Sequence, residues 1–194
     1  MPLHHARIKQ LAASFGLDEL LPKEQSDKIL VSVERDEFTE GERLNTVLRK
    51  METILRGEGI DEETICAAGD VVLELVGNAV LHGRGSQHEP ELIVVSRSQN
   101  HLHIYLFGYG RESQIKRIRE IIQLIGKIAT PPDHRQKLFA RRYENLRRTA
   151  KSPSARKQGA GVGMLTLAAL SNRPLLFKPS PTKRKDSFAL RMSI

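Results

Sequence analysis

The sequence predicts an α/β fold of the α+β type: a two-layer α/β sandwich whose mixed, mostly antiparallel sheet carries helices on one face. Helical and strand-like stretches alternate along the chain, and neighbouring strands look like antiparallel hairpins rather than parts of a doubly wound parallel sheet. The 194 residues are 39 % apolar and contain no Trp, so we expect one core built mainly from Leu, Ile, Val and Ala.

The elements are expected in the following order. Residues 1–27 form an N-terminal extension with one short helix, and residues 28–194 form a single domain with a basic helical insert at about 111–157. Strands are expected at 28–33, 91–96, 101–107, 174–178 and 187–192. Helices are expected at 39–56, 61–81, 112–128, 134–148 and 164–170, with a basic, glycine-rich loop at 151–163.

The chain has no apolar run long enough for a membrane span and no signal-peptide pattern at its N-terminus, which predicts a cytoplasmic protein. Its single cysteine, Cys66, cannot form an internal disulfide, which fits a reducing compartment. Because Cys66 lies in an apolar helical stretch, we expect it to be a small buried hydrophobic residue; a thiol nucleophile is the alternative.

The net charge is +8, and much of the excess lies in one segment, 135–157. There a single acid, Glu144, accompanies nine basic residues: Arg135, Lys137, Arg141, Arg142, Arg147, Arg148, Lys151, Arg156 and Lys157. This segment is a solvated face, or it binds nucleotide phosphates, an acidic protein partner or nucleic acid. Nucleic acid is the weakest of these readings, because no helix-turn-helix, zinc-ligand spacing or aromatic-rich RNA-binding strand is present.

The first motif is the stretch E-L-V-G-N-A-V-L-H-G, residues 74–83. Glu74, Asn78 and His82 follow one another at four-residue spacing, so they project from one face of an otherwise apolar, buried helix. A side-chain amide oxygen is a suitable ligand for Mg²⁺, and a glutamate one turn earlier can accept a proton from a hydroxyl or water. The alternative is the polar edge of a core helix, with Asn78 capping a neighbour.

The second motif is Gly159-Ala160-Gly161-Val162-Gly163, which opens into a helix. Alternate glycines let the backbone approach a ligand closely, and the amides of the helix N-terminus then form an anion site, to which Lys157 adds charge. A flexible loop before a helix is the alternative. The Walker A and dinucleotide-binding patterns do not fit.

An asparagine helix, a β-hairpin, a variable insert and a glycine-box helix follow one another along the chain. In this order of motifs, the chain resembles the GHKL (Bergerat-fold) ATPase superfamily over residues 28–194. The resemblance implies ATP and Mg²⁺ as cofactors, with Asn78 on the metal, Glu74 as the catalytic base and Gly159, Gly161 and Gly163 on the phosphates. Within the superfamily, the chain is most similar to SiaB-type protein kinases and anti-sigma-factor serine kinases. The similarity lies in the leading strand-helix unit, in the helical insert and in the tail G-A-G-V-G-M-L-T-L-A-A-L-S-N-R-P-L.

The chain departs from the superfamily at one position. The usual D-x-G-x-G stretch, whose aspartate binds the adenine amino group, corresponds here to residues 106–110, with Gly108 in place of the aspartate and Gly110 after it. Losing that acceptor removes about 1–3 kcal/mol of base recognition, so another group or a water reads the base, or ATP binds poorly.

The resemblance therefore implies a Mg-ATP-dependent Ser/Thr protein kinase that phosphorylates a small regulatory partner, similar to an anti-sigma-factor antagonist, in bacterial signalling. Arg156 is a further candidate cation, and the insert would be a lid or a partner surface. The alternative is a degenerate pseudokinase that acts as a partner-binding module, as Gly108 suggests. A homodimer is left open, and a histidine kinase fits less well because the chain has no room for a two-helix dimerisation segment.

Overall fold

The computed structural model describes Gln10, Ala13 and residues 28–34, 41–82, 91–98, 101–128, 133–151, 162–179 and 187–194. The helix expected within residues 1–27 lies outside these ranges, apart from Gln10 and Ala13. In the described part of the chain, no helix is both long and apolar enough to cross a membrane.

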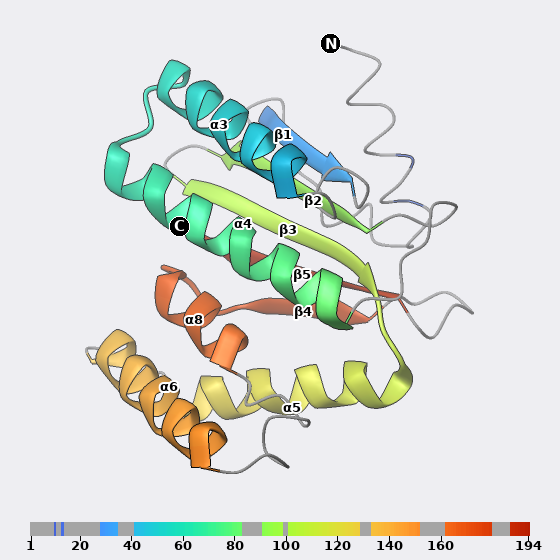
Figure 1. Cartoon of the computed structure of the whole chain (residues 1–194), viewed down its shortest axis with the longest axis vertical. Coiled ribbons are helices and arrows are strands. Elements are labelled where there is room, and N and C mark those ends of the chain that lie inside the picture. Colours follow the sequence, from blue (N-terminus) through green and yellow to red (C-terminus); the bar gives the residue numbers. More distant parts are fainter. Residues whose placement is uncertain are drawn as a thin grey trace.

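The described strands form one five-stranded sheet in the order β1-β2-β3-β5-β4 (Figure 1). The strands are β1 (Lys28–Glu34), β2 (Leu92–Ser98), β3 (His101–Tyr109), β4 (Leu176–Pro179) and β5 (Ser187–Ser193). All pairings between these strands are antiparallel, whereas a mixed sheet was expected. The hairpin β4–β5 reverses the chain after the helices, so that β5 runs antiparallel to β3 even though a long connection separates them.

Helices α3 (Gly41–Gly57), α4 (Glu62–His82) and α8 (Val162–Leu170) lie over one face of the sheet, as predicted (Figure 1). Helices α5 (Glu112–Ile128) and α6 (His134–Lys151) form the insert between β3 and α8, and they lie at the end of the molecule beyond β4. The expected α/β sandwich with helices on one face is therefore confirmed.

Alternation along β3 divides the buried side chains between the two faces of the sheet. Leu102, Ile104 and Leu106 join the main core beneath the helices, while Tyr105 and Phe107 belong to a separate cluster on the opposite face. This is the two-residue period of a strand. Each fully buried aliphatic or aromatic side chain stabilises the fold by about 1.5–3 kcal/mol, so the main core fixes how α4 and α8 sit on the sheet.

The turn between α3 and α4 sets where α4 begins. Gly59 has a φ of +73°, and the amide of Ile60 donates to the carbonyl of Leu55 at 3.1 Å, which closes α3 with a Schellman turn. Asp61 then caps α4, because its Oδ1 accepts from the backbone amide of Thr64 at 2.9 Å.

One prediction about α4 is wrong: Cys66 is exposed, not buried. The helix is not enclosed on all sides, since Leu73 and Val80 are each 45 % exposed. Cys66, Leu73 and Val80 are seven residues apart, which is close to two helical turns, so they form one outward stripe. Apolar composition alone did not reveal which face of α4 meets the sheet.

Candidate functional site

Helix α4 holds Glu74 and Asn78 on one face, as their spacing predicts. The amide nitrogen Nδ2 of Asn78 donates to the backbone oxygen of Glu74 at 2.8 Å and to its carboxylate Oε1 at 3.2 Å. Both side chains are half-buried, while Leu75 and Ala79 beside them are buried in the core. Since Nδ2 is directed at Glu74, the acceptor oxygen Oδ1 is the atom that Asn78 can offer to a ligand.

Helix α8 brings the last glycine of the second motif against this pair. The helix begins at Val162, two residues earlier than predicted, so Gly163 lies in its first turn. A Cβ on Gly163 would lie only 2.1 Å from Oε1 of Glu74 and 3.0 Å from Nδ2 of Asn78. No larger residue fits there without displacing Glu74. The two motifs, far apart in the sequence, therefore meet at one place.

The groups at this junction of α4 and α8 are of the types that bind an anion and a hard cation side by side. The first turn of a helix has backbone N–H groups without intrahelical partners and a partial positive charge, which attracts phosphates and carboxylates. Glu74 and Asn78 contribute carboxylate and amide oxygens, the donor types that Mg²⁺ prefers. Within the described residues, no cluster of three or more His, Cys, Asp or Glu side chains could hold a metal ion.

Gly108 and Gly110 lie at the end of β3, where the chain leaves the sheet for α5. Both are buried, and Gly108 pairs with Phe188 of β5. A Cβ on Gly108 would lie 3.1 Å from Cζ of Phe188, which is tight, whereas one on Gly110 would make only ordinary contacts, such as 3.6 Å to Oε1 of Gln114. Because the neighbouring Phe107 belongs to the opposite cluster, position 108 faces the helical layer.

Glu91 is a candidate site residue that the sequence reasoning missed. It immediately precedes β2 and is 1 % exposed. Its Oε1 lies 3.6 Å from where a Cβ on Gly108 would be. The signal in the sequence was a charged residue at the start of an otherwise apolar strand, but only the register of β2 against β3 places it beside Gly108.

The remaining predicted site residues are not described by the structure. Lys157, Gly159 and Gly161, together with Arg156, lie outside the described residues. His82 ends α4, but its side chain is likewise outside the description. The structure thus brings together Glu74, Asn78 and Gly163 and places Gly108 and Gly110 at the end of a strand on which α4 packs.

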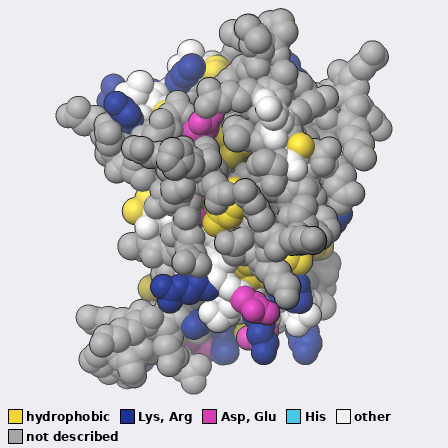
Figure 2. All heavy atoms as spheres, turned by 90° about the vertical axis from the view of Figure 1, so that its right-hand side faces the viewer, with side chains coloured by type: hydrophobic (Ala, Val, Ile, Leu, Met, Phe, Trp, Pro, Cys, Tyr) yellow, Lys and Arg dark blue, Asp and Glu magenta, His cyan; other side chains and the backbone are white. Residues whose placement is uncertain are grey.

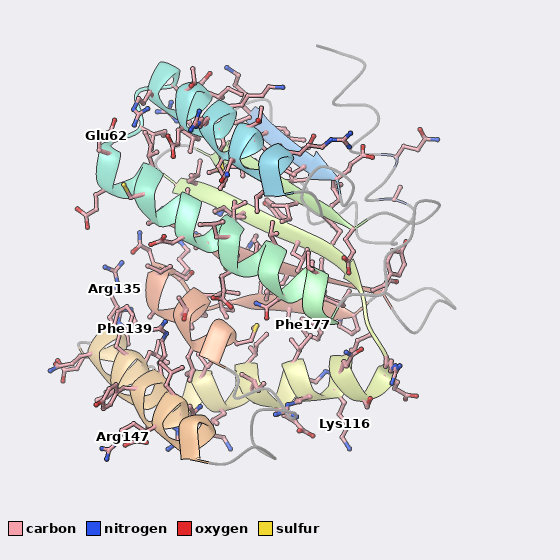
Figure 3. The ribbon with its side chains drawn as sticks, viewed as in Figure 1. Glu62, Lys116, Arg135, Phe139, Arg147 and Phe177 are labelled. Atoms are coloured by element: carbon pink, nitrogen blue, oxygen red, sulfur yellow. The ribbon has the colours of Figure 1, made fainter. Side chains whose placement is uncertain are left out.

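The basic insert presents a second surface, which we call the α6 face. Leu138 is fully buried on the inner side of α6, whereas Phe139, Tyr143 and Leu146 are 45 %, 63 % and 41 % exposed. Their spacing of four and then three residues places them on one side of the helix. The guanidinium of Arg147 lies 5.9 Å from the centroid of the Tyr143 ring. Figure 3 shows Phe139 and Arg147 on the side of α6 turned away from α8.

The adjoining helix α5 is also charged on its outer side. Lys116, Arg117, Arg119 and Glu120 are exposed, and Figure 2 shows Lys, Arg, Asp and Glu side chains gathered at the lower end of that view, where α5 lies. Helix α6 carries seven basic residues and one acid, Glu144, so it is the more strongly basic part of the insert.

Comparison with solved structures finds a chain of the same fold in the crystal structure of the SiaB–SiaC complex from Pseudomonas aeruginosa. The TM-score is 0.64 at 20 % sequence identity, and the match covers 86 % of this chain and 91 % of that chain. No protein-family model matches the sequence, and a search of curated proteins finds no relative.

Proposed function

We propose that the protein is a Mg-ATP-dependent Ser/Thr protein kinase that modifies a small regulatory protein in bacterial signalling. The observation that carries the proposal is the contact of Gly163, in the first turn of α8, with Glu74 and Asn78 of α4. It sets an anion-attracting helix N-terminus beside carboxylate and amide oxygens, which are donor types that Mg²⁺ prefers. The fold shared with a chain of the SiaB–SiaC complex supports the proposal.

Each residue then has a defined task. Bound Mg-ATP supplies the γ-phosphoryl group and a cationic charge that stabilises its transfer. Asn78 would hold the metal through Oδ1, because its Nδ2 donates to Glu74. Glu74 would orient the hydroxyl of the partner and accept its proton, and ADP would be the leaving group. Gly163 would present its backbone amide to the phosphates. The sequence motif suggests the same role for Gly159 and Gly161, and an added positive charge from Lys157 or Arg156, all of which lie outside the described residues.

The α6 face is the proposed docking site of the protein substrate. Its exposed Phe139, Tyr143 and Leu146 are apolar or aromatic, which suits a protein surface better than a phosphate backbone. The helix carries seven basic residues and one acid, Glu144, which pairs with Arg141 at 3.0 Å. An acidic regulatory partner, similar to an anti-sigma-factor antagonist, complements this charge.

The test uses a partner obtained by co-purification from the native cell, with phosphosite mapping to identify the modified residue. Transfer of labelled γ-phosphate to that partner is then compared for the wild type, Asn78→Ala and a control, Asn45→Ala, on the exposed side of α3. We expect Asn78→Ala to abolish transfer without unfolding the protein, and Asn45→Ala to transfer normally. Transfer at the wild-type rate by Asn78→Ala would show that the metal-ligand role is wrong.

A second candidate is a pseudokinase, a module that binds its partner without transferring phosphate. Residues 106–110 favour it, because this stretch lacks the aspartate of D-x-G-x-G. Isothermal titration with Mg-ATP and with a non-hydrolysable analogue separates the two functions. Absence of heat with both nucleotides, combined with tight binding of the partner, would favour the pseudokinase and leave the kinase proposal without support.

A further inference from the structure

The outer side of α6 has the residue pattern of one half of a coiled coil. Phe139, Tyr143 and Leu146 are separated by four and then three residues, which is the spacing of the d, a and d positions of a heptad. All three side chains are exposed, whereas Leu138 on the inner side is fully buried. In the described part of the chain, no helix packs on this outer row (Figure 3).

The positions beside this row are basic. In the same heptad numbering, Arg135 and Arg142 take g positions and Arg147 takes an e position. Side chains at e and g are the ones that form salt bridges with a second helix in a coiled coil. Within the described residues, none of these guanidinium groups has an acidic partner: Arg135 donates to the side chain of Asn172, and Nε of Arg142 is buried without a hydrogen bond.

The single acid of α6 does not balance this charge. Glu144 takes a b position, and its carboxylate pairs with Arg141 at 3.0 Å. The guanidinium of Arg147 lies 5.9 Å from the centroid of the Tyr143 ring, so a flanking cation and an aromatic ring of the row already lie together. A helix that packs on this row must therefore be acidic at its own e and g positions.

Other occupants fit this surface less well. A second copy of α6 would set arginines against arginines at the e and g positions, and such like-charge pairs are repulsive. A nucleic-acid duplex would pair with the arginines but would leave the apolar row unused, since its phosphate backbone is bound by cations. An anionic membrane favours a helix with a broad apolar face, whereas arginines border this row on both sides.

We infer that the α6 face binds an acidic amphipathic helix of the protein partner, which packs along α6 as the second strand of a short coiled coil. Its apolar side chains lie against Phe139, Tyr143 and Leu146, and its Asp or Glu side chains pair with Arg142 and Arg147. The inference rests on the proposed function and deepens it, because it names the element of the partner that docks.

The experiment uses two synthetic helical peptides of three heptads, both with leucine at a and d. One peptide carries Glu at e and g, and the other carries Lys there. Fluorescence anisotropy measures the binding of each peptide to the full chain without nucleotide. We expect the wild type to bind the Glu peptide at least about tenfold more tightly than the Lys peptide. Tyr143→Ala should weaken binding of the Glu peptide about tenfold, because Tyr143 lies at the centre of the row.

Reversing the flanking charges should reverse the choice of peptide. Arg142→Glu combined with Arg147→Glu should lose the Glu peptide and bind the Lys peptide. The control, Lys116→Glu combined with Arg119→Glu on the exposed side of α5, changes the net charge equally and should keep the wild-type preference. Circular dichroism shows whether each variant is folded. Arg147 is exposed, so Arg147→Glu alone serves if the double variant does not fold, and it should shift the preference in the same direction.

The outcomes also separate this inference from the proposed function. Equal binding of both peptides, binding of neither, or an unchanged preference in the folded charge-reversed variant overturns the inference, and so does binding of phosphatidylserine vesicles or a random duplex in place of the peptides. With the co-purified partner, phosphoryl transfer at the wild-type rate by the charge-reversed variant overturns the docking surface and leaves the kinase standing. A partner that binds the wild type through these arginines but is never phosphorylated overturns the kinase and leaves the docking surface standing.

Discussion

Replacing Gly163 by alanine tests the junction of the two motifs, because the new Cβ would lie 2.1 Å from Oε1 of Glu74. Non-bonded carbon and oxygen atoms keep about 3.5 Å apart, so the carboxylate must move by more than about 1 Å. Glu74 has a flexible side chain and can move away, but its hydrogen bond from Asn78, 3.2 Å long, is then lost.

The loss of stability caused by Gly163→Ala can be estimated by comparison with the same substitution at a glycine in α4. Gly69 has nothing within 4 Å of its Cβ position, so Gly69→Ala should stabilise the protein by about 0.5–1 kcal/mol through helix propensity alone. Gly163→Ala should gain a similar amount but lose a partly buried hydrogen bond to a charged group, about 1–2 kcal/mol. We therefore expect Gly163→Ala to be about 1–2 kcal/mol less stable than Gly69→Ala, a difference in Tm of about 2–8 °C.

The assay is urea unfolding followed by circular dichroism, with a double-mutant cycle. In a Glu74→Ala background, the 2.1 Å obstruction and the hydrogen bond are both absent and only the 3.0 Å approach to Nδ2 of Asn78 remains, so the stability difference between Gly163→Ala and Gly69→Ala should become smaller. If Gly163→Ala and Gly69→Ala are equally stabilising in the wild-type background, Gly163 does not contact Glu74. The proposed site would then lose the observation that carries it.

Three further predictions concern the α3–α4 turn and the outer face of α4. Gly59→Ala should destabilise the fold by about 1–2 kcal/mol in urea unfolding, because its φ of +73° is unfavourable for residues with a Cβ, whereas Gly57→Ala should not. Hydrogen bonds from Thr64 hold the pKa of Asp61 below its usual value, so the stability that Asp61 contributes is present above about pH 4 and is lost as the pH falls through the lowered pKa. Asp61→Ala should lower the stability at pH 7 and reduce this acid sensitivity, because the cap is lost. A variant whose stability falls between pH 7 and pH 3 as much as that of the wild type would contradict the cap. Cys66 should react with a thiol reagent in the folded protein, since it is exposed, and a reaction that waits for unfolding would contradict this placement.

The local elements could be read from the sequence because their causes are local. Alternating apolar residues predict β3, and Gly57 and Gly59 mark the break between α3 and α4. The predicted strands and helices within the described residues are present with shifts of a few residues at their ends. The prediction that Cys66 is buried was wrong. The composition of α4 indicates that the helix is apolar, but it does not indicate which side of the helix packs on the sheet.

The four-residue spacing of Glu74 and Asn78 and the alternation of the glycine motif were determined by the sequence alone, since both depend only on helix geometry and backbone freedom. Only the tertiary structure decided that Gly163 contacts Glu74, and that Glu91 lies beside Gly108. These contacts join residues on different elements, so they depend on how α8 packs on α4 and on the register of β2 against β3. Packing and register are set by the whole core, and no local segment of the chain encodes them.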